Sequence, residues 1–303
     1  MYTTLSDFHS DLEKVTHLLK LTGQIKELSG LQDIYINTTP SAKAPSTVIS
    51  NNSVEDESTN HTETTENQGS EVPEIDASLT SPNSELNNLI GDLHSESRSN
   101  HSNLVILNGT LLLFITGRFE SFVRETFEEY CKNLTERVKK FSELPKDMRE
   151  NLIKYTSDVI SNPRRYGHAE NGVKNFVKIM YDNLHDNAPI EINYKCLSIT
   201  SENMRPDTLA DLFKRAGVKN IWERLAQQSK LQVHWGSGDI QSVRKQSETY
   251  LNSLMEIRNS IAHPSTSITW PDSDAITKAL EFFKIFGMVL IDVLPVYEIE
   301  VGN

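Results

Sequence analysis

The segment of the chain best suited to chemistry lies near its C-terminal end, where residues 256–264 read EIRNSIAHP. An arginine can make a bidentate, permanently charged contact with phosphate oxygens, and a histidine near neutral pH can accept or donate a proton. An asparagine can orient either group by hydrogen bonding without titrating. Arg258, Asn259 and His263 therefore suit phosphodiester chemistry, and this set of residues calls for no metal ion and no cofactor.

The spacing of these residues predicts that they lie at the C-terminal end of a helix. Asn259 and His263 are four residues apart and share a face for as long as the helix continues. Pro264 disfavours helical geometry at His263, which places the imidazole at the helix end. A purely structural alternative remains open from spacing alone: Arg258 forms an outward ion pair, while Asn259 and His263 only cap the helix.

The elements that must position this motif are also predicted to be helical. Apolar residues recur at three- and four-residue steps along most of the chain, and one short strand is expected around residues 190–194. The predicted helices cover residues 5–28, 103–141, 146–160, 170–184, a segment from Pro206, a short segment around 221–225, a segment from the turn at 236–239 to Ala262, and a last helix from about 272 that ends before Pro295. The sequence therefore predicts an all-α helical bundle.

Residues 37–84 differ from the rest of the chain in composition. Ser, Thr, Asn, Glu and Pro dominate there and aromatic residues are absent, so the segment cannot bury enough apolar surface to offset its ordering entropy. We interpret it as a flexible acidic linker, with an interaction tail or an electrostatic decoy as the alternative. The predicted organisation is an N-terminal helix (1–36), the linker (37–84) and a helical domain (85–303).

The distribution of charge leaves RNA binding open despite the net charge of −12. Residues 40–100 hold eleven acidic and two basic side chains, a charge of −9, so the remainder of the chain carries only −3. A nearly neutral body can still present a local basic site to RNA.

Several other classes of protein lack their signatures. The sequence has no phosphate-binding loop, no dinucleotide-binding glycine motif, no HExxH zinc helix and no GxSxG nucleophile motif. Cys131 and Cys196 are too few for a disulfide framework, and we interpret His9 and His17 as two ordinary exposed histidines rather than a metal site. No stretch approaches the roughly 20 apolar residues of a membrane span, and no secretory signal is visible. We therefore expect a cytoplasmic protein without a membrane-spanning segment.

The motif and its surroundings resemble a known superfamily. RNSIAHP, at the end of the penultimate predicted helix and before one more apolar helix, resembles the signature of the HEPN superfamily of α-helical ribonucleases: an arginine, a polar residue and a histidine four to six residues beyond the arginine. GRFESFVRETFEEY (residues 117–130) and RPDTLADLFKRAGVKNIWERL (residues 205–225) are similar to the bacterial RiboL-PSP or MAE-type HEPN-like nucleases. The resemblance covers about residues 101–295.

This resemblance implies a metal-independent endoribonuclease that works as a homodimer, with two Arg–His motifs facing one cleft. Arg258 would hold the scissile phosphate, His263 would act in acid–base chemistry, and Asn259 would support both. Glu120 and Arg124 are further candidates because they lie in the resembling segment. Their alternative role is an exposed ion pair at i,i+4.

The biological role is inherited by analogy alone. Such enzymes often serve as toxins or phage-defence effectors, so an antitoxin or a sensor protein is a possible partner besides the RNA substrate and the second copy. The competing interpretations are a non-catalytic HEPN-like dimerisation or interaction module of a defence or toxin–antitoxin system, and a phage-sensing adaptor that uses the first helix and the linker. The presence of all three motif residues favours the active enzyme.

The last predicted helix suggests a surface for the homodimer. Its apolar residues outnumber those that one helix face would bury internally. They are Phe282, Phe283, Ile285, Phe286, Met288, Val289 and Ile291.

Overall fold

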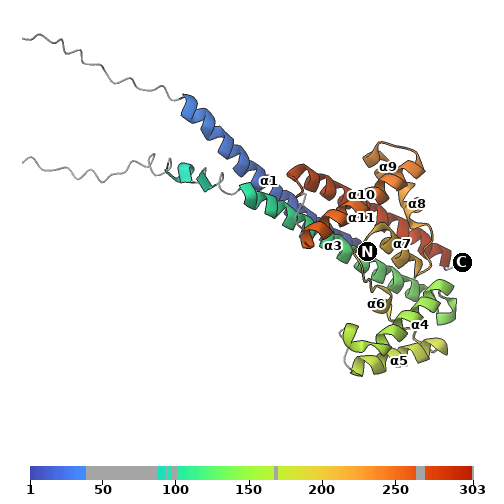
Figure 1. Cartoon of the computed structure of the whole chain (residues 1–303). Coiled ribbons are helices and arrows are strands. Elements are labelled where there is room, and N and C mark those ends of the chain that lie inside the picture. The colour runs from blue at the N-terminus through green and yellow to red at the C-terminus, as the bar shows by residue number, and fades with distance from the viewer. Residues whose placement is uncertain (39–87, 93–94, 97–100, 167–169, 264–269, 302–303) are drawn as a thin grey trace, which may run out of the picture. The chain divides into compact units, whose positions relative to one another are not determined.

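The computed structural model describes residues 1–38, 88–92, 95–96, 101–166, 170–263 and 270–301 (Figure 1). Over these residues the regular structure is entirely helical and contains no strand, which confirms the predicted all-α fold with an N-terminal helix. The predicted linker lies outside the described residues from residue 39 onward. The chain divides into two compact units, Met1–Thr22 with Ser102–Asn303, and Gly23–His101.

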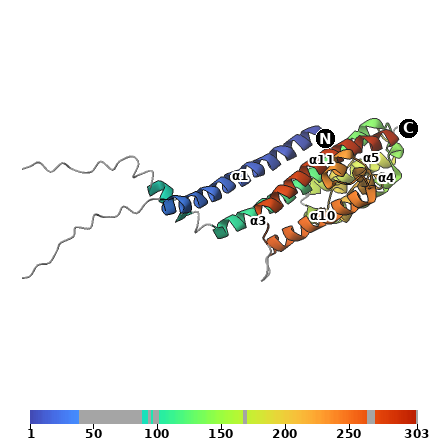
Figure 2. The same cartoon turned by 90° about the horizontal axis from the view of Figure 1, so that it is seen from above.

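The first unit contains the motif and most of the helices. In chain order the elements are α1 (Tyr2–Thr38), whose first part belongs to this unit, α3 (His101–Arg137), the 3-10 turn η1 (Phe141–Glu143), α4 (Lys146–Ser161), the 3-10 turn η2 (Pro163–Tyr166), α5 (Glu170–Leu184), α6 (Tyr194–Leu197), α7 (Pro206–Lys214), α8 (Ile221–Ala226), α9 (Ser229–Trp235), α10 (Ile240–Ala262) and α11 (Ser273–Val301). Both α3 and α10 run beside α11 (Figures 1 and 2).

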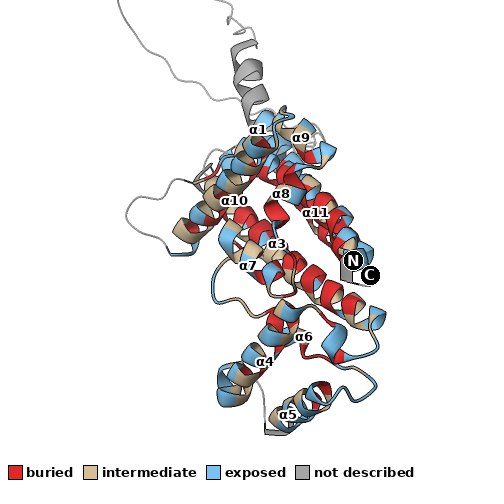
Figure 3. Ribbon diagram, turned by 90° about the vertical axis from the view of Figure 1, so that its right-hand side faces the viewer, coloured by how far each residue is buried: buried red, intermediate tan, exposed pale blue. Residues whose placement is uncertain are grey.

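Aromatic side chains form the centre of this unit. Phe119 of α3 stacks on Phe283 of α11, with the ring centroids 4.5 Å apart, and Phe282 meets Tyr250 of α10 edge to face at 5.1 Å. Trp222 of α8 lies 5.5 Å from the ring of Phe286. Such ring pairs stabilise the core beyond the area that they bury. The buried residues accordingly follow α3, α8 and α11 (Figure 3).

The position of α11 overturns the expected dimer surface. Most of the apolar residues assigned to that surface are fully buried inside the monomer: Phe282, Phe283, Phe286, Val289 and Ile291. The helix is covered on several sides because α3, α8, α9 and α10 all pack against it. A helix that is apolar around most of its circumference is typical of the centre of a bundle. The apolar excess of α11 therefore gives no argument for an interface between copies.

The first part of α1 packs against α3 and α11. Phe8 stacks on Phe122 of α3, with the ring centroids 4.5 Å apart, and Asp11 forms an ion pair with Arg118 at 2.6 Å. The helix extends beyond the predicted 5–28 at both ends. The buried face of the helix follows Leu12, Val15 and Leu19, whereas Leu18 is exposed.

Helix α3 is long and apolar. By length and composition alone, its segment Asn103–Arg137 could cross a membrane, but the core helix of a soluble protein has the same character. In the structure, however, the middle of this helix lies in the aromatic core, where Leu112, Ile115 and Phe119 are buried. This placement is typical of the central helix of a bundle.

A close contact between α3 and the segment before α11 depends on a glycine. A Cβ atom on Gly109 would collide with the indole ring of Trp270 and would lie 3.5 Å from Ile261. Gly109→Ala should therefore lower the free energy of unfolding by about 1–3 kcal/mol, as expected for overpacking. Gly117→Ala on the same helix is the matched control, since its Cβ would meet nothing within 4 Å.

This control should gain up to about 1 kcal/mol from helix propensity. Denaturant unfolding of the two variants measures both effects. An unfolding free energy for Gly109→Ala equal to or above that of Gly117→Ala would contradict the contact.

Two local predictions were wrong. A strand was expected at residues 190–194, but the backbone there is irregular and leads into α6. Ile192, in this irregular segment, is buried in the core. The last helix does not end before Pro295 but continues to Val301. Proline removes one helical hydrogen bond, yet side-chain contacts hold the following turns: Tyr297 Oη donates to the carbonyl of Lys219 at 2.7 Å, and the buried Glu298 carboxylate accepts from Arg137 at 3.0 Å.

Candidate functional site

Helix α10 brings the motif to its C-terminal end. Asp239 caps the start of the helix, where its carboxylate accepts from the backbone N–H of Ser242 at 2.8 Å. The helix ends at Ala262, and His263 occupies the capping position with non-helical angles, φ −126° and ψ 73°. The N–H of His263 still donates to the carbonyl of Asn259 at 3.0 Å. The motif therefore sits on the last turn of a helix that is fixed to the core along its length.

The side chains of Arg258 and Asn259 interact directly. Arg258 Nη1 donates to Asn259 Oδ1 at 3.2 Å, and both residues are half-buried. The same oxygen accepts a second hydrogen bond from Asn203 Nδ2, which comes from the loop before α7. The alternative role of Arg258, an outward ion pair, is not observed: within the described part of the chain no carboxylate pairs with this guanidinium. Its charge is therefore not neutralised by a described acidic side chain.

His263 is exposed at the helix end, close to α3. Ile261, two residues earlier in the chain, packs toward Gly109 of α3. Trp270, which follows residues 264–269 in the chain, covers the same glycine. Since Pro264 lies outside the described residues, the structure shows the end of the helix at Ala262 but not the proline itself. The imidazole is thus anchored through its backbone while its ring faces solvent.

A second group of polar residues lies further along α10. Arg205 Nη1 donates to Asn252 Oδ1 at 2.5 Å and lies 3.5 Å from Glu256 Oε1. Asn252 Nδ2 also donates to Glu256 Oε1 at 2.8 Å. Unlike Arg258, Arg205 has a carboxylate partner, so its charge is partly compensated.

The carboxylate of Glu120 contacts the loop before α7 and is not paired with Arg124 in the described structure. Its carboxylate accepts from the backbone N–H of Met204 at 3.3 Å, and among the described ion pairs there is none between Glu120 and Arg124. The i,i+4 alternative is therefore not the geometry observed. Glu120 connects α3 to the residue that follows Asn203 in the chain.

The loop residues Asn203 and Arg205 were missed by sequence reasoning. Residues 188–205 read as irregular, and a single asparagine in such a stretch carries no motif. The only available signal was the resembling segment RPDTLADLFKRAGVKNIWERL, which starts at Arg205. Their contacts depend on the tertiary packing of α7 against α10.

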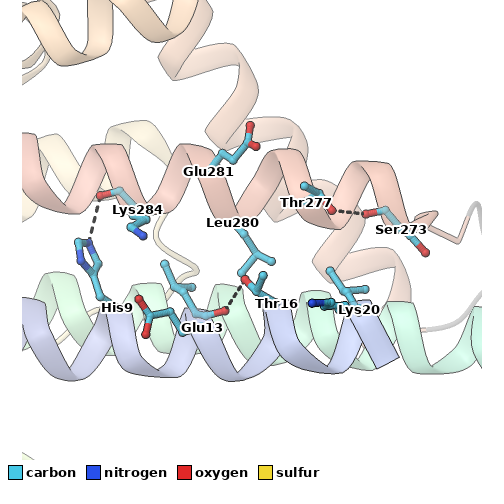
Figure 4. Close-up of a pocket in the computed structure, with 11 residues that line it drawn as sticks. His9, Glu13, Thr16, Lys20, Ser273, Thr277, Leu280, Glu281 and Lys284 are labelled. Atoms are coloured by element: carbon cyan, nitrogen blue, oxygen red, sulfur yellow. Dashed lines mark hydrogen bonds between the residues drawn. The ribbon is translucent and has the colours of Figure 1, made fainter. Parts of the chain in front are cut away.

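A separate cavity of about 430 Å³ lies between α1 and α11 (Figure 4). His9 Nε2 donates across it to the carbonyl of Lys284 at 3.2 Å, and burial lowers the pKa of this imidazole. His17 is exposed. Charged side chains of both signs line the cavity: Glu13, Lys20, Glu281 and Lys284. The two histidines of α1 therefore have different surroundings, and His9 is used in the contact between the helices.

The two cysteines are both buried free thiols. Burial raises the pKa of Cys131 well above its usual value, and it also raises that of Cys196. Because the thiolate is the reactive form of cysteine, neither residue is suited to nucleophilic chemistry.

Comparison with known proteins identifies the family. The model of the RiboL-PSP-HEPN family matches residues 78–294, a range that includes α3 to α10 and most of α11. Neither the comparison with curated proteins nor the comparison with solved structures found a match. The family match spans more than two thirds of the 303 residues and contains all three motif residues. The chain belongs to the RiboL-PSP-HEPN family.

Proposed function

We propose that this protein is a metal-independent endoribonuclease whose site is built from Arg258, Asn259 and His263. Membership of the family indicates a nuclease-like, RNA-related role. The observation that carries the finer proposal is the pairing of a half-buried guanidinium, which has no carboxylate partner among the described residues, with an exposed imidazole at the end of one helix. Arginine suits a phosphate, and histidine suits proton transfer near neutral pH.

The proposed reaction is attack by the 2′-oxygen of RNA on its own adjacent phosphorus. The 2′-hydroxyl loses its proton as the new P–O bond forms, the bond from phosphorus to the 5′-oxygen breaks, and that oxygen takes up a proton. The products are a 2′,3′-cyclic phosphate and a 5′-hydroxyl. Arg258 would bind the phosphate oxygens as their charge is redistributed, and His263 would transfer one of the two protons.

One copy of the motif offers one arginine and one histidine, whereas this reaction needs both a base and an acid. A twofold homodimer would bring a second pair to the same cleft and double the positive charge beside the RNA backbone. Exposed apolar side chains suitable for such a contact lie on α3, where Ile106 is 53% and Phe114 is 43% exposed. Along α3 they lie three residues before and five residues after Gly109, which packs near Ile261, so this part of α3 is close to the end of the motif helix.

The proposed setting is a toxin or phage-defence effector in the cytoplasm, with an antitoxin or a sensor protein as a further partner. The two buried free thiols are compatible with a reducing compartment. The family match supports an RNA-related role, and the biological role rests on the analogy alone.

Incubation of the purified protein with total RNA in EDTA separates this proposal from the non-catalytic interaction module. We expect the protein to fragment RNA under these conditions and to leave DNA of matched sequence intact. RNA that stays intact with the wild-type protein would favour the interaction module.

A further inference from the structure

Three consecutive residues of the loop before α7 contact three different parts of the motif's surroundings. Asn203 reaches Asn259, the backbone N–H of Met204 donates to Glu120 of α3 at 3.3 Å, and Arg205 donates to Asn252 of α10 at 2.5 Å. We call residues 203–205 the clamp loop. It connects α3 to the last turns of α10, directly beside the proposed site.

We propose that Asn203 is a positioning residue that fixes the side-chain amide of Asn259, so that the amide oxygen faces the guanidinium of Arg258. This inference rests on the proposed function, because it assigns a purpose to the orientation of Arg258. Asn203 itself need not touch the RNA, since its effect passes through Asn259.

The chemistry of an amide explains why a second donor is needed. The Asn259 side chain has an oxygen on one side and an NH₂ group on the other, and rotation by half a turn exchanges them. With the oxygen toward Arg258 the two groups attract, whereas the exchanged orientation would place two donors opposite each other. Asn203 Nδ2 and Arg258 Nη1 both donate to Asn259 Oδ1, and only the oxygen can accept from both.

The rest of the clamp loop holds Asn203 in place. Glu120 fixes the backbone of the next residue, and the carboxylate of Glu256 lies 3.5 Å from Arg205. Asn203 is half-buried, which restricts its side chain further. The two arginines therefore have different roles: Arg205 connects the loop to α10, and Arg258 keeps its charge available for a phosphate.

The charge of Arg258 also explains why an amide, rather than a carboxylate, is suited to position 259. A carboxylate would hold the guanidinium more strongly but would neutralise it. A neutral oxygen orients Arg258 and leaves its positive charge available for the RNA backbone. Locking the orientation of a neutral acceptor therefore needs a neighbour such as Asn203.

A double-mutant cycle tests this role. Asn203→Ala should lower kcat/KM for RNA by about tenfold, which corresponds to about 1.4 kcal/mol, mainly through a higher KM. Asn203→Ala added to Asn259→Ala should cause no further loss, because Asn203 acts only through Asn259. Ser201→Ala, at an exposed position just before the clamp loop, is the control and should keep wild-type kinetics.

A substitution of the same size that removes only the donor group gives a second readout. Asn203→Asp keeps the size of the side chain but cannot donate to Asn259 Oδ1, so it should fail to restore activity. Wild-type kcat/KM in Asn203→Ala would overturn the proposal, and so would losses that add fully in the double variant, since these indicate general damage to the fold.

An NMR measurement keeps this test independent of the proposed reaction. In Asn203→Ala the side-chain amide signals of Asn259 should shift and the Nη1 protons of Arg258, which donate to Asn259, should exchange faster with water. Unchanged signals would overturn the positioning role even if the variant cleaved RNA poorly. A wild-type protein that cleaves no RNA, but shows these spectral changes on substitution, would refute the proposed function and leave the positioning role standing.

Discussion

Replacement of His263 with alanine should reduce RNA cleavage by about a hundredfold or more, the loss expected when general acid–base help is removed. The fold should survive, because the ring is exposed and the contact from residue 263 to Asn259 runs through the backbone N–H, which alanine retains. The initial rate of cleavage of a defined RNA, with the variant and the wild type at equal concentration, measures the effect.

His17→Ala provides the matched control for this experiment. His17 is an exposed histidine on α1, and its replacement should leave both the rate and the melting temperature unchanged. Equal rates for His263→Ala and His17→Ala would remove His263 from the mechanism.

The second large effect is expected at the proposed interface between copies. Ile106→Glu combined with Phe114→Glu places two charges in the exposed apolar part of α3 and should shift the protein from twice 34.3 kDa to 34.3 kDa. Because each site needs residues from both copies, cleavage per chain should fall by at least about tenfold. Sedimentation and activity, followed over the same dilution series, measure the two effects together.

A matched control is available on α9, where Val233 is 80% exposed. Val233→Glu introduces one such charge at an apolar surface position and should alter neither mass nor activity. A wild-type chain that sediments at 34.3 kDa and stays fully active would exclude the composite site.

The sequence predicted the helices well because their apolar residues repeat with the period of the helix. The range 170–184 coincides with α5, and the predicted end at Ala262 coincides with the end of α10. The end of α11 could not be predicted in this way. Pro295 is a strong local signal for a helix end, but the buried contacts of Tyr297 and Glu298 with distant parts of the chain outweigh it.

The same contrast holds for the candidate site. Arg258, Asn259 and His263 are close in sequence, so their spacing and a resemblance sufficed to select them. Asn203 is 56 residues away from its partner Asn259, and no local pattern connects the two. The burial of α11 shows the converse error: a run of apolar residues does not reveal whether a second copy or the chain's own helices will cover it.

The ends of the RNA fragments test the central claim most directly. A defined RNA incubated with the wild-type protein in EDTA should yield fragments with a 2′,3′-cyclic phosphate on one side of the cut and a 5′-hydroxyl on the other, and His263→Ala should yield about a hundredfold less of both. Fragments with a 3′-hydroxyl and a 5′-phosphate, loss of cleavage in EDTA, or equal cleavage of matched DNA would contradict the mechanism.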